Sequence, residues 1–235
     1  MKKVVLFSSI ALAITARLMA AESNAKDEVT NAAKKLGDAA NYSWHTTVTV
    51  PEGAPFRPGP TDGKTEKDGF SHITLRFGEN KTEAVLKGDK AAATNQEGEW
   101  QSLSDLDNAE GPARFLGAML RNFKAPAAQA TQLASFAKEL KKEGDVYSGD
   151  LTEEGAKTLL TFRRRAGSEA SVTNPKGSVK FWVKDGELTK YEFNVKGTVS
   201  FNGNDFDQDR TTMVEIKDVG KTKTEVPDGA KKKLT

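Results

Sequence analysis

The sequence contains no cysteine, and this absence excludes several kinds of protein. The fold has no disulfide bonds, no thiolate metal sites and no lipid attached through a cysteine. Small exported domains often depend on disulfides because they cannot bury enough apolar surface. A chain of 235 residues is long enough to be stabilised by a hydrophobic core alone.

Histidine is almost as scarce, with only His45 and His72 in the chain. Each lies on the polar side of a segment that alternates like a strand. The sequence also lacks the HExxH pattern of zinc hydrolases and the GxSxG pattern of serine hydrolases. We therefore expect no catalytic residue, no metal and no cofactor, and we interpret both histidines as exposed strand residues. A hydrolase built on one of them is the less favoured alternative.

The first residues have the features of a cleavable signal peptide. Lys2 and Lys3 precede a largely apolar run from Val4 to Ala16, and small residues then lead to Ala20. A basic start, a short apolar run and a small-residue cleavage site are typical of exported proteins. The run is too short to cross a bilayer as a helix. We predict cleavage near Ala20 and a periplasmic protein, residues 21–235, that does not span the membrane.

The net charge gives no support for nucleic-acid binding. The whole chain has a formal charge of +2 at pH 7. Residues 1–20 hold Lys2, Lys3 and Arg17 and no acidic residue, so the chain without them has a charge of −1. Nucleic-acid-binding domains normally carry a basic surface. We expect no nucleic-acid partner and a monomer in solution.

Helical periodicity is confined to the start and the middle of the chain. Residues 24–40 carry an apolar stripe with a spacing of three and four residues. Gly111-Pro112 and Pro126 precede two central helices, and we expect the second to end at Gly144. Thr152 is a candidate N-cap of a short third helix.

Alternation of apolar and polar residues predicts strands in the rest of the chain. Proline and glycine predict a loop over residues 51–63, and Gly197 predicts a bend or bulge in a long strand. Asp185-Gly186 and Asn202-Gly203 are typical of tight hairpin turns. The predicted strands cover residues 42–50, 72–77, 84–87, 90–93, 178–183, 188–201, 211–219 and 221–226, with another beginning near Trp100.

This order of elements predicts an α+β fold, with a curved antiparallel sheet covered by an N-terminal helix and a central helical insertion. The last third of the chain resembles the LolA/LppX superfamily of periplasmic lipoprotein and lipid carriers. The resemblance is carried by the hairpin at Phe181 to Gly186, the run from Tyr191 to Phe201, the segment Thr211 to Gly220, and Val226-Pro227. It implies an incomplete barrel with an apolar cavity between sheet and helices that holds acyl chains. The chain lacks the lipidated cysteine of the LppX-like members, and no binding residue is carried over from the family.

Aromatic and apolar residues provide the candidate ligand site. Several aromatic residues share one face of the predicted sheet, and an apolar face of the first central helix lies within reach of them. Such a face is either packed core or the wall of a cavity, and the sequence does not separate the two. The candidate ligand-binding residues are Trp44, Phe77, Phe115, Met119, Phe123, Tyr191 and Phe193.

Two charged clusters have simpler interpretations than binding sites. Alternating acids at Asp205 to Asp209 can bind Ca²⁺, but the run lacks the glycine and glutamate of an EF-hand loop, which favours a solvated hairpin tip. Arg163 to Arg165 can contact lipid headgroups, although a polar edge is the favoured interpretation. Lys231 to Lys233 predict a solvated tail.

Together these features predict a soluble carrier or binder of an apolar ligand, the acyl chain of a lipid or lipoprotein, without catalysis. The alternative is a structural or protein-interaction module of the cell envelope with a filled core. The two differ in whether space remains between the central helices and the sheet.

Overall fold

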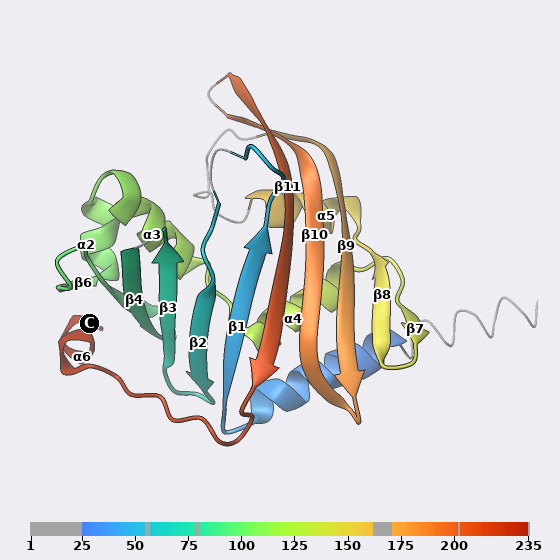
Figure 1. Cartoon of the computed structure of the whole chain (residues 1–235), viewed down its shortest axis with the longest axis horizontal. Coiled ribbons are helices and arrows are strands. Elements are labelled where there is room, and N and C mark those ends of the chain that lie inside the picture. Colours follow the sequence, from blue (N-terminus) through green and yellow to red (C-terminus); the bar gives the residue numbers. More distant parts are fainter. Residues whose placement is uncertain (1–24, 55–56, 79, 162–170, 202, 235) are drawn as a thin grey trace, which may run out of the picture.

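The computed structural model describes residues 25–54, 57–78, 80–161, 171–201 and 203–234 (Figure 1). The predicted signal peptide, Phe162 and the arginines at 163–165 lie outside the described residues. Within the described ranges, no helix is long and apolar enough to cross a membrane.

One antiparallel sheet forms the body of the protein (Figure 1). Its order is β6-β5-β4-β3-β2-β1-β11-β10-β9-β8-β7, so β6 and β7 form its two edges and the sheet stays open. The first and last strands pair at its centre, where β1 lies beside β11. The strands are β1 (Asn41–Thr49), β2 (Thr61–Glu66), β3 (Ser71–Phe77), β4 (Asn80–Lys87), β5 (Lys90–Thr94), β6 (Trp100–Ser102), β7 (Lys141–Glu143), β8 (Val146–Asp150), β9 (Ser171–Lys184), β10 (Glu187–Phe201) and β11 (Asn204–Lys217).

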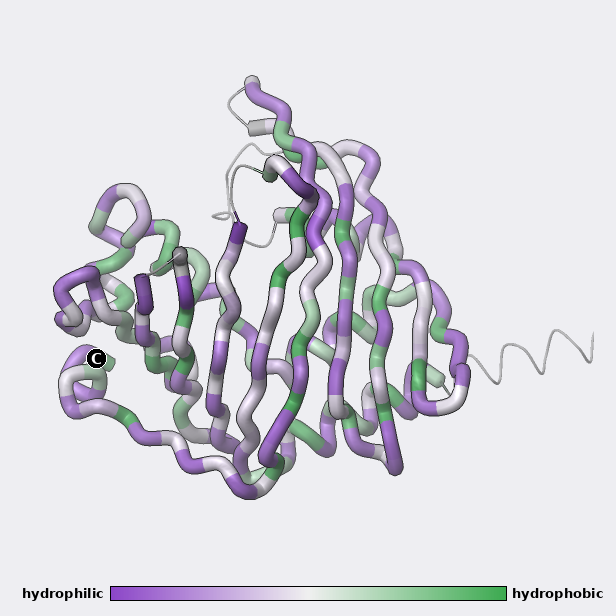
Figure 2. Tube along the Cα trace, in the orientation of Figure 1, coloured by the Kyte–Doolittle hydropathy of each residue, from purple (hydrophilic) through white to green (hydrophobic). Residues whose placement is uncertain are grey.

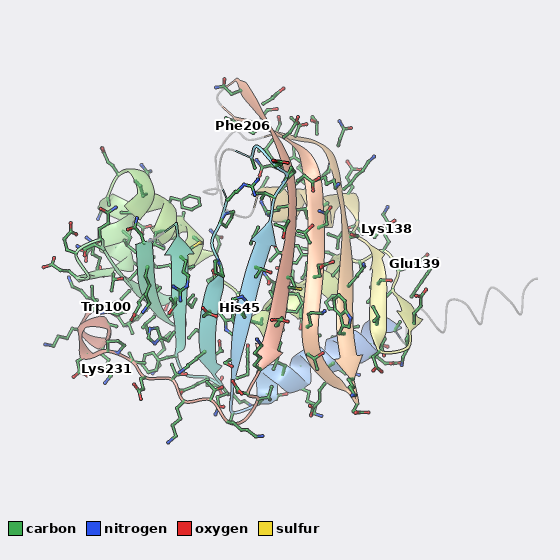
Figure 3. The ribbon with its side chains drawn as sticks, in the orientation of Figure 1. His45, Trp100, Lys138, Glu139, Phe206 and Lys231 are labelled. Carbon is green, nitrogen blue, oxygen red and sulfur yellow. The ribbon has the colours of Figure 1, made fainter. Side chains whose placement is uncertain are left out.

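The helices lie mainly on one face of this sheet. The N-terminal helix, residues 25–38, crosses behind the central strands, and α2 and α3 lie beside the end formed by β3 to β6 (Figure 1). The short helix α6 packs on edge strand β6, where Trp100 and Lys231 lie near each other (Figure 3). The labelled helices are α2 (Leu103–Asn108), α3 (Gly111–Arg121), α4 (Pro126–Phe136), α5 (Glu153–Thr161) and α6 (Asp228–Lys233).

The core lies between the helices and the inner face of the sheet. Hydrophobic and hydrophilic residues alternate along the long central strands (Figure 2), as expected for a sheet with one covered face. Phe181 and Tyr191 are completely buried on that face, and Val29 and Ala33 of the N-terminal helix are buried against it. The predicted fold class, an open antiparallel sheet covered by helices, is therefore confirmed.

Local turn chemistry explains several boundaries. Asp185 and Gly186 both have positive φ angles, 52° and 73°, as a two-residue hairpin turn requires. The predicted irregularity at Gly197 is confirmed, because the β9–β10 register shifts between Lys196 and Thr198. The Thr152 hydroxyl accepts a hydrogen bond from the Gly155 amide at 3.0 Å and caps α5 as predicted.

The predicted loop over residues 51–63 is wrong at its end, because β2 begins at Thr61. The strand Thr61–Glu66 has no apolar side chain, so alternation does not reveal it. It forms because its main chain pairs with β1 on one side and β3 on the other. The inner face of β2 is instead completed by the indole of Trp44, which lies over Gly63.

The second central helix is shorter than predicted. It ends at Phe136, and Ala137 then forms a β-bridge with Leu151. Gly144, which we expected to stop the helix, has a positive φ of 62° in the turn between β7 and β8. A left-handed glycine serves a helix end and a hairpin turn equally well, so the local signal is ambiguous.

The end of the chain also differs from the prediction. Residues 221–226 do not form a strand but run past the ends of β2 and β3 (Figure 1). The Thr224 amide donates to a Glu66 carboxylate oxygen at 3.2 Å, and the Glu225 carbonyl accepts from His72 Nδ1 at 3.0 Å. The predicted lysine tail, Lys231 to Lys233, is exposed but belongs to helix α6.

An ion pair joins the N-terminal helix to the β7–β8 edge of the sheet. Glu28 accepts hydrogen bonds from Lys142 Nζ at 2.5 Å and from the Tyr147 hydroxyl. The hydrogen bond from Lys142, and then the one from Tyr147, lowers the pKa of Glu28, and the bond to Glu28 raises the pKa of Lys142. A lowered carboxyl pKa stabilises the fold at neutral pH, and this stabilisation is lost as the pH falls through the folded-state pKa.

We therefore expect Glu28→Gln to be less stable than the wild type at pH 7, with the difference shrinking as the pH falls below about 4. Urea unfolding at pH 7, 5 and 3 measures the free energy of unfolding at each pH. Glu143→Gln, on exposed strand β7, is the control and should not change the pH profile. If Glu28→Gln lowers the free energy of unfolding by the same amount at pH 3 as at pH 7, the carboxylate charge is not involved.

Candidate functional site

An apolar cavity of about 180 Å³ lies between the centre of the sheet and the helices α3 and α4. Strands β1, β2, β3, β10 and β11 contribute its floor, and α3, the α3–α4 connection and the start of α4 contribute its roof. The helical lining is largely apolar, and includes Phe115, Met119, Leu120 and Phe123. Space therefore remains between the central helices and the sheet.

The strand register explains why the floor residues converge. Thr46 is paired with Val214, and Val214 is paired with Tyr191 on the next strand. Two residues further along β1, Val48 is paired with Thr212, which is paired with Phe193. Side chains of paired residues point to the same face of a sheet, so these rows form a continuous floor.

The indole of Trp44 closes one end of the cavity. Its ring stacks on Phe123 of the α3–α4 connection, with the ring centroids 6.0 Å apart. Its Nε1 donates to the Thr65 hydroxyl at 3.2 Å, and Thr65 is 3.1 Å from the Ser71 hydroxyl. These contacts satisfy the buried indole N–H of Trp44, so the orientation of the ring is well defined.

Tyr191 and Gln129 form the polar contact inside the cavity. The Tyr191 hydroxyl donates to Gln129 Oε1 at 2.7 Å, and both residues line the cavity. Burial, and to a lesser extent the charge of Tyr42, raises the pKa of Tyr191 well above its usual value. The phenol therefore stays protonated and keeps its role as donor. The bond ties α4 to β10 across the cavity.

Six of the seven candidate ligand residues line this one cavity: Trp44, Phe115, Met119, Phe123, Tyr191 and Phe193. The seventh, Phe77, lies at the end of β3, and its side chain is outside what the structure describes. Within the set, Tyr191 is fully buried whereas Phe115 is 38% exposed. The set thus combines core residues with a surface residue.

Sequence analysis missed other lining residues. Val48, Ile73, Leu75 and Val214 line the cavity but were predicted only as the buried side of strands. Their strand parity was a usable signal, since residues on one side of neighbouring strands share a face. Gln129 carried no such signal, because its place in the cavity depends on how α4 docks on the sheet.

Within the described part of the chain, the charged residues that line the cavity are cations, namely Arg76, Lys124 and Arg210. Arg210 Nη2 donates to the Leu159 carbonyl at 2.6 Å, which connects β11 to α5. The neighbouring acid, Asp209, lies 2.9 Å from Lys196 Nζ and accepts from Asn194 Nδ2 at 3.0 Å. Cations around an apolar cavity disfavour a ligand that is itself positively charged.

The two histidines do not line this cavity. They lie on strands as predicted, but their side chains are 30% and 21% exposed, so they are half-buried rather than exposed. His45 Nδ1 is 2.7 Å from Asp62 Oδ1 (Figure 3), and His72 Nε2 is 3.3 Å from Glu83 Oε2. The hydrogen bonds found for these two rings run to carboxylates and a carbonyl. This arrangement does not supply the hydroxyl nucleophile that a Ser-His-acid hydrolase needs.

The acidic cluster forms part of a strand. Asp205, Asp207 and Asp209 alternate with Phe206 and Gln208 along β11, so the three carboxylates lie on the same face of the sheet. Asp207 accepts from the Thr198 hydroxyl at 2.7 Å. Across the described ranges, no group of three or more His, Asp or Glu residues is placed to hold a metal ion.

Comparison with known proteins reveals similarity in structure. No family model matches the sequence, and no curated protein matches it. The structure is similar to the lipoprotein LppX of Mycobacterium tuberculosis, with a TM-score of 0.49 and 9% sequence identity over 86% of this chain and 98% of LppX. It is also similar to LprF of Mycobacterium bovis, with a TM-score of 0.46 and 13% identity over 88% of this chain and 98% of LprF.

Proposed function

We propose that this protein binds the apolar chain of a lipid or lipoprotein in the cavity between α3 and the sheet, and carries it outside the cytoplasm without catalysing a reaction. The observation that carries the proposal is the cavity itself, an apolar space of about 180 Å³ that the core does not fill. Residues 1–20 support export, since their composition is that of a signal peptide.

The size of the cavity sets the part of a ligand that fits. An apolar cavity of about 150 Å³ is large enough to bind benzene in another protein. Five buried methylenes contribute about 4 kcal/mol, which corresponds to roughly millimolar affinity. The cavity therefore suits part of an acyl chain, and tight binding requires burial of additional chain.

The absence of catalysis is part of the proposal. The support comes from the cavity lining, which is mostly apolar and contains a buried tyrosine whose raised pKa keeps it neutral. Among the described residues that line the cavity, the other ionisable groups are cations, so none of these residues supplies a carboxylate as a general base.

Native mass spectrometry of the protein purified from its own cell envelope tests the proposal. We expect the protein to retain a co-purified lipid or fatty acid, and the delipidated protein to bind a fluorescent fatty acid with saturation. A protein that is free of ligand and does not bind the fatty acid would support an envelope interaction module instead. The same spectra report whether the protein is the expected monomer.

A further inference from the structure

A second hollow, of about 590 Å³, lies beside the first half of α3, where Pro112, Ala113, Phe115 and Leu116 line it. Its apolar wall includes Leu106 of α2 and Leu116 of α3, which are 1% and 8% exposed. Its rim carries polar residues of β4 and of the β5–β6 turn, among them Asn80 and Gln96. An apolar wall with a polar rim is typical of a site for an amphiphilic ligand.

Phe115 is the common wall of the two hollows. It lines the cavity over the central strands and also lines the second hollow over β4. On the same helix, Met119 lines only the first and Leu116 lines only the second. The two spaces therefore meet at the phenyl ring of Phe115.

The floor of the sheet is continuous beneath this ring. Leu75 of β3 lines the first cavity, and Thr82 of β4 lines the second hollow. These two residues are direct partners in the β3–β4 register, so their side chains are neighbours on one face. The two floors therefore join at this pair.

The exposure of Phe115 is unusual for so large an apolar side chain. It is 38% exposed, while Leu116 and Leu120 of the same helix are buried. An exposed side chain changes rotamer quickly and without movement of the backbone. An apolar chain that covers the ring also removes its exposed surface from water, which favours binding.

We infer that the two hollows are parts of one channel for an apolar chain, and that Phe115 determines how far the chain extends from the first part into the second. This inference rests on the proposed function. The first cavity alone, at about 180 Å³, is smaller than the roughly 300 to 1,000 Å³ of most ligand sites, whereas both parts together fall within that range. The ligand is accordingly a long-chain amphiphile rather than a short apolar molecule.

Affinities for saturated fatty acids with 8 to 18 carbons test this inference. In the wild type we expect affinity to rise by about fourfold for each methylene until the first cavity is full. The rise then weakens, because a longer chain has to displace the Phe115 ring. In Phe115→Ala the fourfold rise continues to longer chains, and in Phe115→Trp it stops at a shorter chain.

Phe206→Ala is the matched control. Phe206 is also an exposed phenylalanine, 46% exposed, but it lies near the start of β11, away from α3 (Figure 3). In Phe206→Ala the affinity should depend on fatty-acid chain length as it does in the wild type. Circular dichroism checks that each variant is folded. If Phe115→Ala does not fold, Phe115→Trp still tests the inference.

The outcomes separate the inference from the proposed function. Fatty acids that bind with identical chain-length profiles in the wild type and both Phe115 variants would overturn the channel while leaving the carrier function in place. Failure of the folded wild type to bind any fatty acid of the series would overturn the carrier function, and with it the channel.

Discussion

Met119→Trp is expected to weaken binding of a fatty acid by more than tenfold while the protein remains folded. Met119 is partly buried on α3 and lines the cavity, so a larger ring at this position occupies space that the ligand needs. Excluding two methylenes from the cavity costs about 1.6 kcal/mol, which corresponds to slightly more than tenfold in affinity. Titration with a fluorescent fatty acid measures the dissociation constant directly.

The same substitution on the outer face of the sheet provides a matched control. Met213 lies on β11 and is paired with Thr47 and Glu192, on the side away from the helices. Met213→Trp introduces an identical ring outside the cavity lining and should leave the dissociation constant unchanged. If Met119→Trp binds the fatty acid as well as Met213→Trp does, the ligand does not occupy this cavity.

Gly63→Ala is expected to destabilise the protein by about 1 to 3 kcal/mol, the usual cost of overpacking a core. A Cβ atom at Gly63 would overlap Cζ2 and Cε2 of Trp44 and lie 2.7 Å from its Nε1. The indole then has to move away from β2, which breaks its hydrogen bond to Thr65 and pushes the ring towards the cavity. Stability and fatty-acid affinity should therefore fall together.

Urea unfolding followed by tryptophan fluorescence measures this loss. Gly37→Ala is the control, because its added Cβ would meet only Ala127 Cβ at an ordinary distance of 3.5 Å. Gly37 lies within the N-terminal helix, where alanine is about 1 kcal/mol more favourable than glycine, so this variant should be at least as stable as the wild type. A Gly63→Ala protein of wild-type stability would show that the Trp44 ring is not fixed over β2.

Sequence-based prediction succeeded where local periodicity reflects burial. On one face of β9 and β10 the alternating residues are largely buried, and Phe181 and Tyr191 are among them. The stripe on the N-terminal helix is likewise buried, at Val29 and Ala33. In each case the hydrophobic effect acts on a pattern that is visible within a single element. The strand residues Trp44, Tyr191 and Phe193, chosen as ligand candidates, share a face for this same reason.

Prediction failed where structure depends on partners distant in the sequence. Strand β2 has no apolar side chain and forms through the main chains of β1 and β3 and the indole above Gly63. Strand β7 falls within the helix predicted to end at Gly144, because Gly144 fits both structures, and β8 was not predicted. Neither element is encoded by its own hydrophobic pattern.

The sequence by itself determined a helix-covered antiparallel sheet and the parity of its strands, because side-chain alternation and helical periodicity are local properties. That the sheet is open was implied by the family resemblance and not by periodicity. Only the tertiary structure decided which apolar residues are core and which border a cavity. Phe181 and Phe193 have the same strand parity pattern, yet only Phe193 lines the cavity. The difference depends on the spacing between α3 and the sheet, which is set by long-range contacts such as Trp44 with Phe123. Such a spacing has no signature in local sequence, since it results from packing among elements far apart in the chain.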